Sequence, residues 1–211
     1  MEADGPGGRA NQNGRVNQKQ RTRAAIVAAA RDLITGSAEV TMPAVARAAL
    51  VSEATAYRYF PDLVSLLREV IDGTWPSPAQ ALASVEHSTD AVERVAAGTE
   101  RLLRHVQAYQ GAVRAMIAAS VVRPGAAGLR PGYRFGVIDH ALAPLESSLG
   151  RDDPESFRRL KQDLGIVVSA EALFTLTDLY ELPPEEAIAS AVRSARTITA
   201  AAIGAAAAGP R

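Results

Sequence analysis

Residues 41–67 read TMPAVARAALVSEATAYRYFPDLVSLL, and this stretch contains three successive helix starts. Thr41 can cap a short helix, and the proline two residues later is tolerated in the first turn because that backbone position needs no N–H. Ser52 can cap a second helix and Asp62 a third, since short oxygen-bearing side chains accept hydrogen bonds from the first free N–H groups. Two short helices joined by a tight turn form a helix-turn-helix. The stretch predicts this motif, with Ser52 to Tyr59 as its second helix.

The second short helix separates its apolar side chains from its polar ones. At about 3.6 residues per turn, Ala56, Phe60 and Leu63 fall on one face and can pack inward. The remaining faces carry hydroxyl, charged, aromatic or very small side chains, which are Ser52, Glu53, Ala54, Thr55, Tyr57, Arg58 and Tyr59. A DNA major groove about 12 Å wide admits one helix, and hydroxyl groups and helix N-termini donate to phosphate oxygens. The pattern therefore indicates a surface that binds double-stranded DNA.

The N-terminal part of the chain is basic, although the formal net charge of the 211 residues is zero. Between residues 5 and 31 no side chain is acidic, and the basic ones are Arg9, Arg15, Lys19, Arg21, Arg23 and Arg31. Residues 1–18 are rich in Gly, Asn and Gln, which predicts a flexible basic arm. An arm of this kind can enter the neighbouring minor groove and add affinity that falls with salt. Arg21 and Arg23 are therefore candidate DNA contacts.

The hydrophobic pattern divides the chain into two helical parts. Residues 19–72 hold the short helices described above, and residues 73–211 hold longer ones. Asp153 and the proline after it predict the start of a helix that runs to about Tyr180, and the prolines at 183–184 predict the start of the last helix. We find no strand pattern and no hairpin flanked by alternating apolar residues, so the predicted fold is all-α.

Composition excludes several classes of protein. The absence of cysteine rules out disulfides, cysteine-bound zinc and thiol nucleophiles. No run of eighteen apolar residues and no signal peptide is found, so we expect a cytoplasmic protein without a membrane partner. The three histidines show no metal-binding spacing, and the sequence has no phosphate loop, dinucleotide fingerprint or nucleophile elbow. We therefore expect no enzyme activity and no cofactor.

Residues 41–67 resemble the N-terminal DNA-binding domain of the tetracycline-repressor (TetR) family of bacterial regulators. The shared pattern is a Thr at the first helix, an Ala-rich helix, a Val-Ser turn, and an aromatic-rich helix that ends in Tyr-x-Tyr-Phe before a Pro. The resemblance implies that Thr41, Tyr57 and Tyr59 contact phosphates. It also implies a groove-facing set, which comprises Ser52, Glu53, Ala54, Thr55 and Arg58.

Two positions depart from the family pattern. Leu50 stands where the family usually has a glycine in the turn. If that residue needs a positive φ, leucine costs roughly 1–2 kcal/mol, and otherwise the turn has another geometry. The family also often has a lysine near the start of the fourth helix, where this chain reads Asp62-Leu63-Val64.

The resemblance further implies that the C-terminal helices form a homodimer and hold a small-molecule effector. Apolar positions in the last helices predict the dimer interface at Leu164, Val168, Leu179, Ile188, Val192 and Ala195. Polar residues of the middle helices are the candidates for a ligand pocket, namely His105, Tyr109, Gln110, Tyr133, Arg134 and His140. The predicted function is a transcriptional regulator, a ligand-relieved repressor that acts as a homodimer on a palindromic operator. The alternative is a helical protein-interaction module with a degenerate helix-turn-helix that does not bind DNA.

Overall fold

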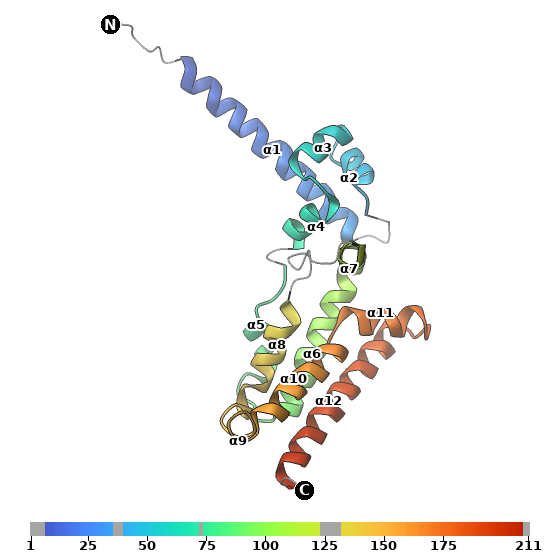
Figure 1. Ribbon diagram of the computed structural model, residues 1–211. Helices are drawn as coiled ribbons and strands as arrows, with labels where there is room; N and C mark the ends of the chain where they lie inside the picture. The colour runs from blue at the N-terminus through green and yellow to red at the C-terminus, as the bar shows by residue number, and fades with distance from the viewer. Residues whose placement is uncertain (1–6, 36–39, 72–73, 123–131, 209–211) are drawn as a thin grey trace, which may run out of the picture. The chain divides into compact units, whose positions relative to one another are not determined.

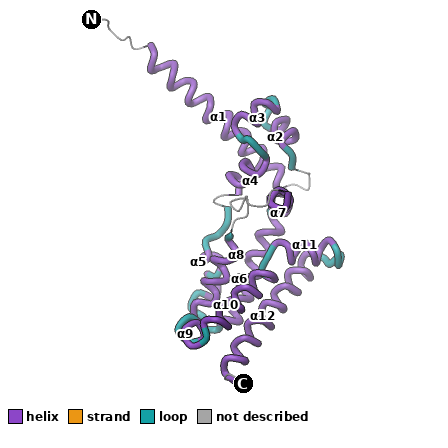
Figure 2. Tube along the Cα trace, viewed as in Figure 1, coloured by secondary structure: helices purple, strands orange, loops and turns teal. Residues whose placement is uncertain are grey.

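The computed structural model describes residues 7–35, 40–71, 74–122 and 132–208, and these residues form helices and loops without a strand (Figures 1 and 2). They group into two compact units. Unit 1 comprises residues 1–74 and 114–129, and unit 2 comprises residues 75–113 and 130–211. The predicted all-α fold is confirmed for the described residues. Residues 114–122, which the sequence analysis assigned to the C-terminal part, group with unit 1.

Unit 1 contains four helices that precede residue 74. They are α1 (Gly7–Thr35), α2 (Met42–Ala48), α3 (Glu53–Tyr59) and α4 (Leu63–Ile71), and α7 (Gln110–Val122) adds its residues from Arg114 on. Helix α1 packs against α2 and α4, and α2 packs against α3. The buried side chains of this small core include Ile26, Ile34, Val45, Ala56, Phe60, Leu66 and Leu67. Helix α4 contributes most because its apolar residues recur at helical spacing along one face.

The three predicted helix caps are present. The Thr41 hydroxyl accepts a hydrogen bond from the Ala44 N–H at 3.3 Å, and Asp62 Oδ1 accepts one from the Ser65 N–H at 2.7 Å. Ser52 caps α3 in the same way. Each cap satisfies a backbone N–H that has no partner inside its own helix, which fixes where the helix begins.

Helix α1 begins at Gly7, so residues 7–18 are helical where the sequence analysis predicted a flexible arm. The arm was inferred because this segment offers almost nothing to bury. It contains no proline, and its five Gln, Arg and Ala residues are good helix formers, which offsets part of the cost of its three Gly and three Asn residues. Once the packed turns around Ile26 have nucleated the helix, each further residue adds one hydrogen bond at little cost. The part of the arm at residues 1–6 lies outside the described residues.

The turn between α2 and α3 contains a leucine in the left-handed region. Leu50 has a φ of 57°. Its N–H donates to the Arg47 carbonyl at 3.2 Å, and the Val51 N–H donates to the Ala46 carbonyl at 2.9 Å. This pair of hydrogen bonds defines a Schellman motif, in which the residue at the Leu50 position is usually glycine. The positive φ considered from the family pattern is therefore present, and this leucine carries the associated strain.

Unit 2 contains the remaining helices. They are α5 (Pro78–Ala81), η1 (Ala83–Val85), α6 (Ala91–Ala108), α8 (Tyr133–Leu142), η3 (Ala143–Leu145), α9 (Leu149–Asp152), α10 (Pro154–Val167), α11 (Ala170–Asp178) and α12 (Pro184–Ala208). Helix α6 packs against α8 and α12, and α10 packs against α8 and α12. Gly98 allows the close approach of α6 and α8, since a Cβ there would lie 2.9 Å from Cγ1 of Val137. The core between these helices is apolar and includes Leu102, Ile138, Leu142, Leu160 and Leu164.

The helix predicted from Pro154 to Tyr180 is in fact two helices. Helix α10 ends at Val167, and Ser169 caps α11 by accepting a hydrogen bond from the Ala172 N–H at 3.1 Å. The Ser169 hydroxyl also donates to the Ile166 carbonyl at 2.7 Å. The apolar periodicity continues through the break, so periodicity alone could not reveal it, whereas the capping serine is its local cause.

A buried arginine connects three backbone segments of unit 2. Arg94 on α6 is only 5% exposed. Its guanidinium donates to five carbonyl oxygens, those of Ala141 at 3.2 Å, His140 at 2.7 Å, Val85 and Glu86 at 3.1 Å, and Ser88 at 3.4 Å. The charge is thus solvated by carbonyl dipoles, which is the arrangement that a buried cation needs.

Candidate nucleic-acid interface and effector region

Helix α3 is held by its cap and by two buried side chains. The Ser52 hydroxyl accepts a hydrogen bond from the Thr55 N–H at 3.2 Å and lies 2.9 Å from the Thr55 hydroxyl. Ala56 and Phe60 are buried against the core of unit 1. Because these contacts fix the rotation of the helix, they also fix which side chains face outward. Figure 1 shows α3 beside α2 in this unit.

The outward face of α3 carries the side chains that the sequence analysis selected for DNA. Glu53, Ala54 and Arg58 are exposed, and Tyr57 is 47% exposed. Tyr59 is half-buried, and the Arg58 guanidinium carbon lies 5.8 Å from the centre of its ring. The outward face thus carries a guanidinium and two phenol hydroxyls, which can donate hydrogen bonds to phosphates. The small Ala54 on the same helix allows its backbone to approach base edges closely.

The two candidate arginines of α1 have different surroundings. Arg21 is exposed, whereas Arg23 forms an ion pair with Glu69 of α4 and lies over the Phe60 ring at 4.8 Å. Arg23 therefore links α1 to the core of unit 1, and its role as a DNA contact stays a prediction. The spacing of charges in sequence could not show this ion pair, because the partner lies 46 residues further along the chain.

A basic cleft lies between α1 and α3. It has a volume of about 400 Å³ and is lined by Gln18, Lys19, Arg58 and Tyr59. All four lining side chains can donate hydrogen bonds, and none is acidic. The sequence analysis selected Arg58 and Tyr59 but not the two residues of α1. Lys19 belongs to the basic run, which was the available signal, and the continuous helix from Lys19 to the packed turns around Ile26 is what brings it beside α3.

The fold and the outward face of α3 define a helix-turn-helix protein of the class that binds double-stranded DNA. A family model described as bacterial regulatory proteins, tetR family, matches residues 26–70, which run from the packed part of α1 to near the end of α4. Residues 26–70 thus carry the DNA-binding domain of this family, and the chain is a DNA-binding transcriptional regulator, as the sequence analysis predicted. No curated protein and no solved structure gives a significant match to the chain.

In unit 2 the structure brings three of the six predicted pocket residues together around a tryptophan. The ring centre of Trp75 lies 4.3 Å from that of His105 and 4.8 Å from that of Tyr133, and His105 lies 4.6 Å from Tyr109. These four residues form the aromatic cluster. Its central member, Trp75, was not among the predicted residues, although it is the only tryptophan in the chain.

The other three predicted pocket residues are placed elsewhere. Arg134 donates to Glu171 at 3.2 Å, and its guanidinium carbon lies 5.0 Å from the Phe135 ring centre. Gln110 is exposed at the start of α7, and His140 supplies its backbone carbonyl to Arg94. Neither of these two has a contact with the aromatic cluster among the interactions of the described residues.

Burial changes the acid–base behaviour of the aromatic cluster. Loss of solvent lowers the pKa of His105 below its usual value, and the nearby Arg101 charge lowers it further. Burial also raises the pKa of Tyr133, while Arg101 acts in the opposite direction. At neutral pH both rings are therefore uncharged. The described residues contain no group of three or more His, Asp or Glu side chains that could hold a metal ion.

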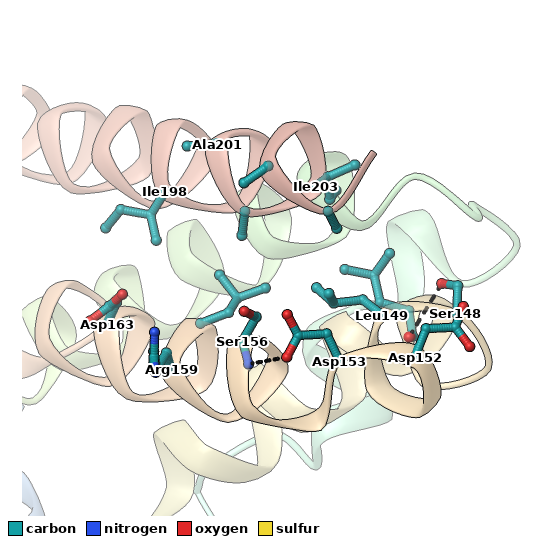
Figure 3. A pocket seen from close by; sticks show the side chains of 15 residues that line it. Ser148, Leu149, Asp152, Asp153, Ser156, Arg159, Asp163, Ile198, Ala201 and Ile203 are labelled. Atoms are coloured by element: carbon teal, nitrogen blue, oxygen red, sulfur yellow. Dashed lines mark hydrogen bonds between the residues drawn. The ribbon is translucent and has the colours of Figure 1, made fainter. Parts of the chain in front are cut away.

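A groove of about 990 Å³ lies between α10 and the C-terminal half of α12 (Figure 3). Its α12 wall is formed by small or aliphatic residues, among them Ile198, Ala201, Ala202 and Ile203. The facing wall holds Leu149 and Leu160 and is edged by charged side chains, including Asp152, Arg159 and Asp163. Asp153 caps α10, since its carboxylate accepts a hydrogen bond from the Ser156 N–H at 3.0 Å.

The structure places most of the predicted dimer-interface residues inside unit 2. Leu164, Val168, Ile188 and Ala195 are buried within the subunit, and a side chain without exposed area offers no surface to a partner. Val192 is half-buried, whereas Leu179 is 78% exposed. The four buried residues are therefore core residues of the single chain. Periodicity identified an apolar face correctly but could not say whether this chain or a second one covers it.

No helix among the described residues is long and apolar enough to cross a membrane.

Proposed function

We propose that the protein is a repressor that binds a palindromic operator as a homodimer and is released by a small-molecule effector. The observation that carries the proposal is the outward face of α3, where Tyr57 and Arg58 are exposed while Ala56 and Phe60 fix the helix from within. A dimer that occupies a promoter blocks polymerase, so repression is the simplest consequence of operator binding. As a regulator of bacterial genes, it would act in the cytoplasm.

The contacts to DNA divide into two groups in this proposal. Thr41, Tyr57 and Tyr59 contact phosphates, as does Arg21 from α1, and these contacts set affinity and register. The groove-facing residues read base edges or allow close approach, and they are Ser52, Glu53, Ala54, Thr55 and Arg58. Thr41 fits its role because its hydroxyl oxygen accepts the α2 capping bond while its proton remains available to a phosphate oxygen.

The homodimer is proposed to form over the groove between α10 and α12. The exposed side chains of α12 along this groove are mostly alanines, which allow the α12 helix of a second copy to approach closely. A two-fold symmetric contact repeats the same surface on both subunits and matches a palindromic operator. Ala201→Arg should shift the chain from dimer to monomer in light scattering after gel filtration. Ala200→Arg, a neighbouring exposed residue that does not line the groove, is the control and should leave the dimer intact.

The first test of DNA binding is fluorescence anisotropy with DNA that flanks the gene of this protein, at two salt concentrations. We expect tight binding to a short palindrome that weakens steeply as salt rises. Tyr57→Phe should weaken binding to all operator variants alike by a few-fold, because it removes one hydrogen bond worth about 0.5–1.5 kcal/mol. Tyr180→Phe, which changes an exposed tyrosine of unit 2, should have no effect.

Two results would count against this scheme. Altered discrimination between operators in Tyr57→Phe, with overall affinity intact, would contradict its phosphate role. Failure of the folded protein to bind any flanking DNA at low salt would instead support the helical interaction module. Arg21→Gln serves as a further check, since loss of a cationic phosphate contact should reduce the salt dependence, whereas loss of the Tyr57 hydroxyl should not.

A further inference from the structure

Two hydrogen-bond donors of the aromatic cluster are buried without a partner. The indole Nε1 of Trp75 and the hydroxyl of Tyr133 have no solvent contact and no hydrogen bond in the described part of the chain. Buried polar groups in folded proteins are almost always satisfied, so each exception calls for an explanation. Among the described residues there are three such atoms, and two of them belong to one pair of rings whose centres are 4.8 Å apart, the third being Nε of Arg134.

The cluster is assembled from three separate segments. Trp75 precedes α5, His105 and Tyr109 lie at the end of α6, and Tyr133 begins α8. The rings are tilted by 35–45° to one another, so they are neither flat stacks nor perpendicular pairs. Aromatic side chains bind planar aromatic groups through these same offset and tilted geometries.

The polar groups of the aromatic cluster favour a ligand that accepts hydrogen bonds. The indole N–H can only donate, and the phenol proton is likewise available. His105 is uncharged, and the positive charge of Arg101 acts on both His105 and Tyr133. A cationic ligand would therefore meet donors and a like charge, whereas a carboxylate would receive hydrogen bonds and a favourable field.

We propose that the aromatic cluster is a binding site for a planar aromatic carboxylate, with Trp75 Nε1 and the Tyr133 hydroxyl donating to its carboxylate oxygens. Both atoms are closed to solvent in the free protein, so the ligand enters by displacing a neighbouring ring, a rearrangement that its binding stabilises. Identification of this ligand as the effector rests on the proposed function, but its binding to the cluster does not.

The single tryptophan gives a direct assay of binding. The full chain without DNA is titrated with benzoate and 2-naphthoate, and Trp75 emission is followed after correction for absorbed light. Naphthalene and 2-naphthylmethylammonium are the matched probes, since they keep the ring but lack the carboxylate. We expect a saturable change with a carboxylate, and at least about ten-fold weaker binding of the cationic probe, because charge-assisted hydrogen bonds are lost.

The Tyr133→Phe variant tests whether the Tyr133 hydroxyl binds the ligand or stabilises the fold. It should weaken carboxylate binding by about ten-fold or more, the usual effect of deleting a hydrogen bond to a charged group. Because the hydroxyl has no partner in the free protein, the same change should leave hydrogen exchange of α8 as slow as in the parent protein or slow it further. Tyr180→Phe is the matched control and should change neither quantity. A hydroxyl with a merely structural role would give the opposite result, lower stability with unchanged binding.

The inference and the proposed function fail in different assays. Carboxylates that bind no tighter than the cationic probe, or that bind equally well to Tyr133→Phe, would overturn the inference even if another compound releases the protein from DNA. Conversely, saturable binding at Trp75 that leaves operator affinity unchanged would support the inference and contradict the effector response at this site.

Discussion

Replacement of Leu50 by glycine should stabilise the helix-turn-helix. Leu50 occupies the left-handed position of the Schellman motif that ends α2, with a φ of 57°. Its side chain is 93% exposed, so the change removes almost no packing. The two hydrogen bonds of the motif are made by backbone N–H groups and remain possible with glycine at the same φ.

The expected gain follows from two opposing terms. A non-glycine residue in the left-handed region costs roughly 1–2 kcal/mol, and glycine removes this cost. Glycine also gives the unfolded chain more freedom, which opposes the gain by about 0.4–1 kcal/mol. The net stabilisation is about 0.5–1 kcal/mol. Leu50→Ala keeps the backbone strain while it removes the exposed side chain, so it is the control and should be nearly neutral.

Hydrogen exchange of residues 41–60 is the suitable measurement, because it reports on the helix-turn-helix itself, whereas a melting temperature averages over both compact units. We expect exchange in Leu50→Gly to slow by about two- to five-fold, the factor that corresponds to the expected gain. Operator affinity should stay unchanged, since the Ser52 cap and the outward face of α3 are unaffected. Exchange in Leu50→Gly as fast as in Leu50→Ala would refute the assignment of strain to Leu50.

Three further predictions concern caps and the buried arginine. Ser52→Ala should destabilise α3 by about 1 kcal/mol through loss of its cap and weaken operator binding, as measured by exchange and anisotropy. Arg94→Met should destabilise unit 2 by about 3 kcal/mol or more in urea unfolding, because it leaves carbonyls that Arg94 now satisfies without a donor. Hydrogen bonds from Ser156 hold the pKa of Asp153 below its ordinary 3.8, so the unfolded chain takes up the proton first as pH falls. The stability from this cap should therefore be complete above pH 3.8 and decrease below it. In Asp153→Asn that acid-dependent part should disappear, and an unchanged pH profile would contradict the assignment.

The sequence was most informative where side chains act on the backbone next to them. Thr41, Ser52 and Asp62 each accept a hydrogen bond from the residue three positions further along the chain, so a cap is visible in the sequence before any tertiary structure is known. The inward position of Ala56 and Phe60 follows equally from local helical spacing. The arrangement of the helix-turn-helix was predictable for this reason.

Contacts between distant segments were not predictable in the same way. Arg94 reaches carbonyls 46 and 47 residues away, and Arg23 pairs with Glu69, yet nothing near either arginine in sequence marks these partners. Trp75 was overlooked for a similar reason, because its ring neighbours come from α6 and α8. The candidate ligand site is thus made of residues whose proximity depends on the packing of unit 2.

The proposed dimer interface shows how an alanine-rich sequence limits prediction. Along α12, Ala187, Ala191 and Ala195 are buried, whereas Ala201 and Ala205 are exposed. The residue type is the same on both sides, so hydrophobic periodicity cannot distinguish a face covered by this chain from one left for a partner. Once α6 and α10 have covered the first face, the alanines beside the groove remain as the surface where two copies can approach closely. The proposed interface therefore lies on the C-terminal half of α12 and not on the buried residues that periodicity selected.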